Sequence, residues 1–259
     1  TALAKRPLQG RWSSCDSMDT SEKTRAIALK AIRYGESSLI VKLITEDLGL
    51  QSFIIKGALK KGAKIRSALF QPLTLLSIVR NKGKGELAYL KEAGVEYSFQ
   101  TIPFDINKNA IVLFLCELIT KSIQDSETDI ELFGFIFDSL IHLDEAEENY
   151  ADFPLKFAIE LSRLLGFAPN TNDYKEGHVF DLNEGHYCNS STNIIFPIEG
   201  ECNKVFKELC DTSIFDDIRL GISNEVRRKM LGYIITYYRL HVNGFKEMNS
   251  NEILRTILQ

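Results

Sequence analysis

The sequence lacks any long hydrophobic run. The uninterrupted apolar stretch at residues 110–116 ends at Glu117, whereas a helix that spans a bilayer needs about 20 predominantly apolar residues. The composition therefore excludes a membrane-spanning protein. A chain of 259 residues can bury a sizeable core, and its length suits one large or two modest domains.

Cysteine is scarce and scattered. The five cysteines at positions 15, 116, 188, 202 and 210 form no CxxC pair, and their number is odd. This pattern does not indicate a disulfide framework and favours a reducing compartment, so we expect a cytoplasmic protein. Residues 1–17 lack the apolar core of a signal peptide, and we interpret residues 1–22 as an added or disordered leader.

Acidic residues are few in the segment that follows this leader. Residues 19–98 contain 14 Lys and Arg against 8 Asp and Glu, whereas residues 99–259 contain 14 against 26. The net charge of −4 hides this asymmetry. Charge that is segregated along a chain indicates the partners of each part. The N-terminal part is therefore predicted to meet a polyanion, and the rest is not.

Short alternating segments dominate the basic part. Strands are expected at residues 25–34, 38–45, 50–56, 73–80 and 86–92, with Ile27, Leu29 and Ala31 on one face of the first. Because five strands in so short a segment leave no room for crossover helices, they predict an antiparallel meander closed into a barrel over residues 23–98. The OB-fold is the commonest barrel of this kind, and it often binds oligonucleotides.

Cations gather in one glycine-punctuated loop and at one hairpin tip. They are Lys56, Lys60, Lys61, Lys64 and Arg66 in the loop at residues 56–66, with Lys82 and Lys84 at the tip. Such a loop can lay its lysines along a phosphate chain, where each neutralised phosphate releases a counterion. The alternative is a solvated loop whose lysines only maintain solubility. The GxxxxGKS/T spacing of a nucleotide-binding loop is absent.

Helical periodicity begins near residue 104. Asp105, Asp129 and Ser223 can each cap a helix, Pro154 marks the first turn of another, and Ser250 begins a short terminal one. Leucines and aromatic residues recur at helical spacing, which is typical of a packed core and not of a cofactor site. We therefore expect a helical domain over residues 99–259, with a polar insertion at residues 171–200 that holds two weak β-segments.

Six segments in order resemble the RecO family of recombination mediators, which act in bacterial recombinational DNA repair. The matching segments are residues 30–41, 49–57, 66–73, 164–170, 180–185 and 237–246. None is diagnostic alone, but their order and spacing hold from residue 23 to the end. The resemblance implies an α+β protein, in which an N-terminal OB-fold precedes a helical bundle with a zinc-ribbon-like insertion.

The same resemblance implies an activity without chemistry. Family members bind single- and double-stranded DNA, anneal strands, and help to load recombinase onto strands coated by single-stranded DNA-binding protein. The implied partners are RecR and the C-terminal tail of that coating protein. The phosphate-contacting positions of the family fall on Arg33 and on the five cations of the loop at residues 56–66.

The insertion departs from the family pattern. Many members place two CxxC pairs there, a strong signature of tetrahedral zinc, but residues 172–177 contain no cysteine. The soft ligands nearby are His178, His186, Cys188 and Cys202, and their spacing matches no standard structural-zinc pattern. We therefore expect no metal and no cofactor. The insertion would instead pack on the bundle through apolar side chains, namely Phe180, Leu182, Ile194, Ile195 and Phe196.

Cations that could hold the acidic tail of the coating protein are limited in the helical part. In this family the tail ends in an aromatic residue, so it needs a cation beside an apolar pocket. Arg227 and Arg228 open the helix that Ser223 caps and oppose its dipole there, so we expect them to hold the tail. Arg239, near the other end of the helix, is the alternative anchor, although a purely structural role would also explain it.

No histidine lies near a nucleophile and a carboxylate in a recognisable catalytic arrangement. His142 and His241 lie at helix ends, where they have structural interpretations, and the acidic run at residues 144–148 is typical of a solvated loop. We therefore predict a DNA-binding mediator that is not an enzyme. The competing hypothesis is an adaptor whose barrel binds protein, and salt-sensitive DNA binding would separate the two.

Overall fold

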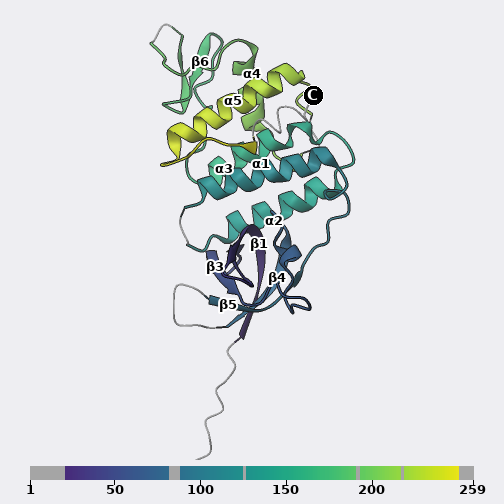
Figure 1. Cartoon of the computed structure of the whole chain (residues 1–259). Helices are drawn as coiled ribbons and strands as arrows, with labels where there is room; N and C mark the ends of the chain where they lie inside the picture. The colour runs from purple at the N-terminus through teal and green to yellow at the C-terminus, as the bar shows by residue number, and fades with distance from the viewer. Residues whose placement is uncertain (1–20, 82–87, 125–126, 191–192, 217–218, 251–259) are drawn as a thin grey trace, which may run out of the picture.

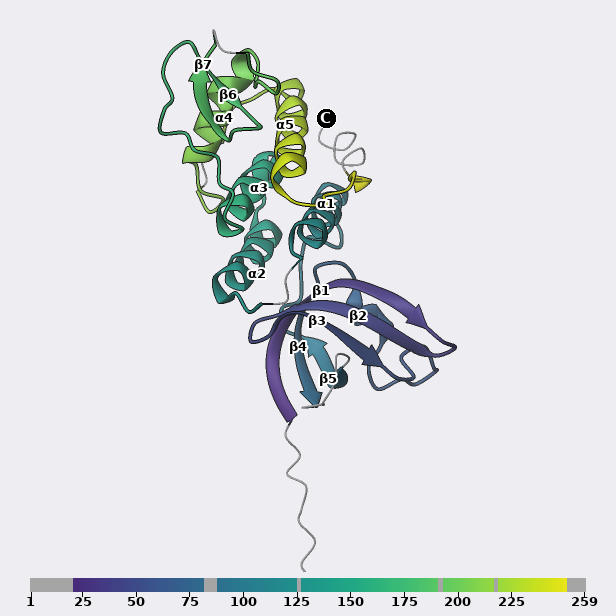
Figure 2. The ribbon, with the colours of Figure 1, turned by 90° about the vertical axis from the view of Figure 1, so that its left-hand side faces the viewer.

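The computed structural model describes residues 21–81, 88–124, 127–190, 193–216 and 219–250. A β-barrel lies at one end of the molecule, and a small β-hairpin lies at the other (Figure 1). Layers of helices fill the space between them, as the perpendicular view also shows (Figure 2). The predicted α+β class, with a barrel followed by helices, is confirmed.

Five strands form the barrel. They are β1 (Ser21–Tyr34), β2 (Ser38–Thr45), β3 (Gly49–Ile55), β4 (Leu75–Asn81) and β5 (Ala88–Val95). The closed order is β1-β2-β3-β5-β4, and the predicted simple antiparallel meander is wrong, because β3 pairs with β5 in parallel. The reason is the length of β1, which pairs with β4 through its first half and with β2 through its second. β4 therefore returns to β1, and β5 closes the gap to β3.

A β-bulge changes the face that β1 presents. The register of β1 on β2 shifts between Ala28 and Lys30, so that Leu29 is an extra residue in the ladder. Leu29 packs toward the helices together with Ile27, but Ala31 pairs with a residue that points into the barrel. The predicted continuous face is therefore wrong beyond the bulge.

Five α-helices follow the barrel in the described part of the chain. They are α1 (Ile106–Ser122), α2 (Ile130–Glu145), α3 (Phe153–Leu164), α4 (Glu201–Asp211) and α5 (Asn224–His241). The predicted caps are confirmed, since Asp105, Asp129 and Ser223 each accept a hydrogen bond from a first-turn N–H group. The sequence analysis missed α4, whose apolar stripe is short. No helix described here combines the length and the apolarity that a bilayer span requires.

The barrel and the helices share one hydrophobic core. Ile27, Ile44 and Leu50 lie on the outer face of the barrel and belong to the same buried cluster as the apolar faces of α1 and α2. Arg25 reinforces this junction, because its guanidinium carbon lies 4.8 Å from the centroid of the Phe137 ring. The helical part is thereby fixed against one end of the β1–β2–β3 face.

The insertion is a two-stranded hairpin that packs on the bundle. Its strands are β6 (His178–Asp181) and β7 (His186–Asn189), and Phe180 stacks against Phe206 of α4 at a centroid distance of 4.6 Å. Phe180 and Leu182 are buried as predicted. The prediction for Ile195 and Phe196 is wrong, since they are 75% and 39% exposed, and Ile198 fills the core instead.

Candidate nucleic-acid interface

The loop after β3 projects its charges because its apolar residues point inward. Ala58 and Ile65 are buried in the barrel core, and Gly62 turns the chain between them with a φ of 78°. The loop is also tied to the turn between β1 and β2, since Leu59 N donates to Ser37 O over 3.1 Å. The charged side chains between these anchors are left in solvent.

All five predicted cations of this loop are exposed. They are Lys56, Lys60, Lys61, Lys64 and Arg66. Among the described residues, no carboxylate forms an ion pair with Lys60, Lys61 or Arg66, whereas Lys64 Nζ lies 3.0 Å from Glu92 Oε1 and lowers the pKa of that carboxyl. An exposed pair of this kind is weak and is screened by salt. The loop therefore presents a concentration of positive charge that little else on the barrel neutralises.

The remaining predicted cations of the barrel have different settings. Arg33 is exposed on the half of β1 that pairs with β2 alone, shortly before the turn that the loop contacts. The structure thus brings Arg33 to the same end of the barrel as the loop. Lys82 and Lys84 lie outside the described residues.

Two further cations on the barrel were missed by the sequence analysis. Lys30 on β1 and Lys42 on β2 are direct register partners on the outer face. Like charges placed opposite each other on a sheet destabilise it, so an anionic partner would relieve this pair. The signal was hidden, because the bulge after Ala28 sets which β1 residues share a face with Lys42.

Exposed aromatic residues accompany these cations. Tyr34 at the end of β1 is 55% exposed, and Tyr89 on β5 is 42% exposed. The Nζ atom of Lys56 lies 4.6 Å from the centroid of the Tyr89 ring. Cations interleaved with exposed rings are typical of surfaces that bind single-stranded nucleic acid.

Arg227 is not available to a partner, which corrects the expectation that it holds a tail. Its side chain is 7% exposed, and its Nε donates to Asp152 Oδ1 over 2.8 Å. Asp152 belongs to the turn that precedes α3, and its carboxylate is buried too. The helix dipole argument for this residue fails because a buried carboxylate already compensates its charge.

Arg228 and Arg239 lie along one groove on α5, although the sequence analysis treated them as alternatives. Both are exposed, and they lie at either end of a cavity of about 440 Å³ whose middle is lined by Gly232, Tyr233 and Thr236. Residues spaced by one, two and three helical turns share a face. The groove therefore offers two guanidinium groups on either side of an aromatic ring.

The possible soft ligands of the insertion do not converge. In the hairpin register, Cys188 pairs with Val179 and His186 pairs with Asp181, while His178 belongs to the opposite face with Phe180. Cys202 is buried in the core on α4, and burial raises the pKa of its thiol. Within the described residues, no three His, Cys, Asp or Glu side chains are grouped as metal ligands.

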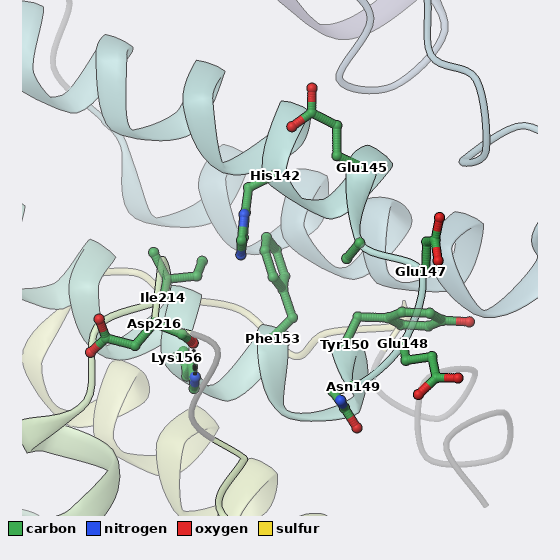
Figure 3. A pocket seen from close by; sticks show the side chains of 11 residues that line it. His142, Glu145, Glu147, Glu148, Asn149, Tyr150, Phe153, Lys156, Ile214 and Asp216 are labelled. Atoms are coloured by element: carbon green, nitrogen blue, oxygen red, sulfur yellow. Dashed lines mark hydrogen bonds between the residues drawn. The ribbon is translucent and has the colours of Figure 1, made fainter.

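A cavity of about 490 Å³ lies between the ends of α2 and α3 (Figure 3). His142 points into it beside Phe153, at a centroid distance of 6.3 Å, while Glu145, Glu147 and Glu148 surround its rim. Its described lining brings no Ser, Thr or Cys side chain to His142. The cavity thus shows no nucleophile that the imidazole could activate.

Comparisons with known proteins agree with this architecture. The N-terminal model of recombination protein O matches residues 18–99, and its C-terminal model matches residues 103–250. A DNA repair protein RecO from Christiangramia forsetii is 36% identical over 90% of this chain and 98% of its own length. Proteins of the same name from Flavobacterium johnsoniae and Azobacteroides pseudotrichonymphae are 35% and 30% identical, each over 91% of this chain and 98% of their own lengths. With both domains matched in order on a five-stranded barrel and a helical bundle, the chain belongs to the RecO family of DNA repair proteins.

Proposed function

We propose that the barrel binds single- and double-stranded DNA and that the protein is a recombination mediator. In this role it anneals strands and assists the loading of recombinase onto coated single-stranded DNA in the bacterial cytoplasm. The observation that carries the proposal is the loop at residues 56–66, which presents five exposed cations on the barrel of a DNA repair family. Reversible binding is sufficient for this function, so we assign no catalytic residue.

The expected binding is electrostatic and tolerant of sequence. Lysine and arginine side chains on a flexible loop neutralise phosphates, and the released counterions make the affinity fall steeply with salt. Phosphate contacts carry no sequence information. A mediator that must act wherever DNA is damaged needs this property.

The proposal extends to protein partners. The groove on α5 supports a site for the acidic C-terminal tail of single-stranded DNA-binding protein, because Arg228 and Arg239 can meet carboxylates while Tyr233 contacts an aromatic end group. RecR is proposed as a second partner from family membership alone.

The test is a salt titration with a charge-matched control. Fluorescence anisotropy on a single-stranded oligonucleotide would compare the wild type with the variant Lys60→Ala, Lys61→Ala, Arg66→Ala. The triple variant should lower the slope of log affinity against log salt by roughly two to three, since each lost phosphate contact removes about 0.9.

The control variant removes three exposed lysines of the helical domain, namely Lys175→Ala, Lys204→Ala, Lys246→Ala. It changes the net charge equally but leaves the loop intact, so its slope should remain that of the wild type. Equal slopes for wild type and loop variant, with native circular dichroism for both, would contradict the proposal.

A further inference from the structure

A row of apolar side chains crosses four strands on the outer face of the barrel. Its members are direct register partners, namely Ile32 on β1, Ile40 on β2, Ile54 on β3 and Tyr89 on β5. Paired residues lie on the same face of a sheet, and successive residues alternate between faces. Because the neighbours Val41 and Phe53 lie in the barrel core, this row points away from the core.

The row is exposed where the rest of that face is covered. Nearer the helices, Ile27, Ile44 and Leu50 are buried against the bundle. Farther along the same strands, Ile32 remains 51% exposed and Tyr89 remains 42% exposed. A contiguous exposed apolar surface on a soluble barrel marks a binding site.

Cations border the row on both sides. Lys30 and Lys42 are paired two positions away from Ile32 and Ile40 on the same outer face. On the other side, Lys56 follows Ile54 by two positions and places its Nζ 4.6 Å from the centroid of the Tyr89 ring. A ligand that fits this surface has flat apolar groups for the middle and anions for both edges.

Unpaired DNA has this chemistry, and duplex DNA does not. In a duplex the faces of the bases are stacked on one another, and only base edges are accessible in the grooves. In a single strand the faces can pack on apolar and aromatic side chains while lysines contact the phosphates. The outer face of strands β2 and β3 is also where barrels of this type take oligonucleotides.

We propose that the row at Ile32, Ile40, Ile54 and Tyr89 is a stacking surface for the bases of single-stranded DNA. Lys30, Lys42 and Lys56 contact the adjoining phosphates. This inference rests on the proposed DNA binding of the barrel. It adds a second surface beside the loop at residues 56–66, and that surface distinguishes unpaired from paired strands.

The test compares single-stranded and duplex oligonucleotides by fluorescence anisotropy. The variant Ile32→Ser, Tyr89→Ala should bind the single strand at least about tenfold more weakly, since one base stacked on an aromatic ring is enough for this change. Its duplex affinity and its salt slope should match the wild type. Tyr89→Phe keeps the ring and should retain wild-type affinity for the single strand.

A reporter variant tests contact directly and does not depend on the loss of affinity. Trp12 is the one tryptophan of the sequence, so Trp12→Phe, Tyr89→Trp carries a single indole in the row. Titration with oligo(dT) should quench its fluorescence, and titration with duplex should not. Thermal unfolding of each variant verifies that the barrel is intact.

Three results would overturn the inference. If the row variant binds single strands like the wild type while the loop triple variant binds them weakly, the row is not a stacking surface although the barrel still binds DNA. If neither variant changes DNA binding, the proposed function fails together with the inference. If the row variant loses binding to RecR while its affinity for single strands is unchanged, the row is a protein interface.

Discussion

The Arg227 guanidinium forms a buried ion pair with Asp152. Its Nε donates to Oδ1 over 2.8 Å, and the two side chains are 7% and 3% exposed. The same carboxylate accepts from Leu220 N at 3.2 Å. The pair thus connects the first turn of α5 with the segments that precede α3 and α5, and it stabilises the packing of the helical domain.

Loss of either partner should destabilise the protein. Arg227→Ala leaves the Asp152 carboxylate buried without its cation, and such a change typically costs about 3–5 kcal/mol of unfolding free energy. The neighbouring Arg228→Ala should change stability by less than about 0.5 kcal/mol, because that side chain is exposed. Urea unfolding of the two variants measures both values. Equal stabilities would show that the ion pair has no structural role.

The tail groove on α5 should depend on both of its exposed arginines. Arg228→Ala, Arg239→Ala should weaken binding of a labelled acidic tail peptide at least tenfold, about 1.4 kcal/mol, as measured by anisotropy. Lys175→Ala, Lys204→Ala provides the control of equal charge change away from the groove. Unchanged peptide affinity in the groove variant would place the tail site elsewhere.

Glu92 should restrain DNA binding through its pair with Lys64. Glu92→Gln removes the carboxylate that lies 3.0 Å from Lys64 Nζ, so the lysine can neutralise a phosphate instead. The salt slope should steepen by up to about 0.9 and the affinity should rise. Glu96→Gln, an exposed barrel variant of the same charge change, should have a smaller effect on the slope. Identical slopes for the two variants would mean that Lys64 does not contact phosphate.

The ion pair and hydrogen bonds of Glu117 should make stability depend on acidic pH. Burial alone would raise its pKa, but hydrogen bonds from Ser250, Lys121 and Asn249 lower the pKa from 4.5 to about 2. Because the folded pKa is the lower one, the ionised group stabilises the fold above pH 4.5, and this contribution is lost as pH falls toward 2.

The variant Glu117→Gln measures this contribution. At pH 7 it should be less stable than the wild type by about 1.5–3 kcal/mol, the usual value of a hydrogen bond to a charged group. The difference should shrink in urea unfolding below pH 4.5. The exposed control Glu176→Gln should show no such trend. A difference that stays constant down to pH 2.5 would argue against this assignment.

The absence of zinc stays a prediction, and the register of the β6–β7 hairpin supports it. His178 lies on one face of the hairpin, and His186 and Cys188 lie on the other. Elemental analysis of purified protein should therefore find far less than one zinc per chain. A full equivalent that disappears in Cys188→Ser would contradict the prediction, and dialysis against a chelator should leave the unfolding curve unchanged.

The sequence alone determined the features that depend on residues a few positions apart. Alternation at period two is a local property, and it located the strands of the barrel. A capping side chain reaches an N–H group within its own first turn, so Asp105, Asp129 and Ser223 marked their helices correctly. Charge counts located the basic loop, because loop cations need no partner elsewhere in the chain.

Tertiary structure decided everything that depends on distant partners. Arg227 and Arg228 are adjacent and chemically identical, yet the side of α5 that faces Asp152 buries one and leaves the other in solvent. In the same way, the bulge in β1 aligned Lys30 with Lys42, and closure of the barrel brought Tyr89 beside Ile54. These pairings follow from register and packing over long sequence separations, which local periodicity does not encode.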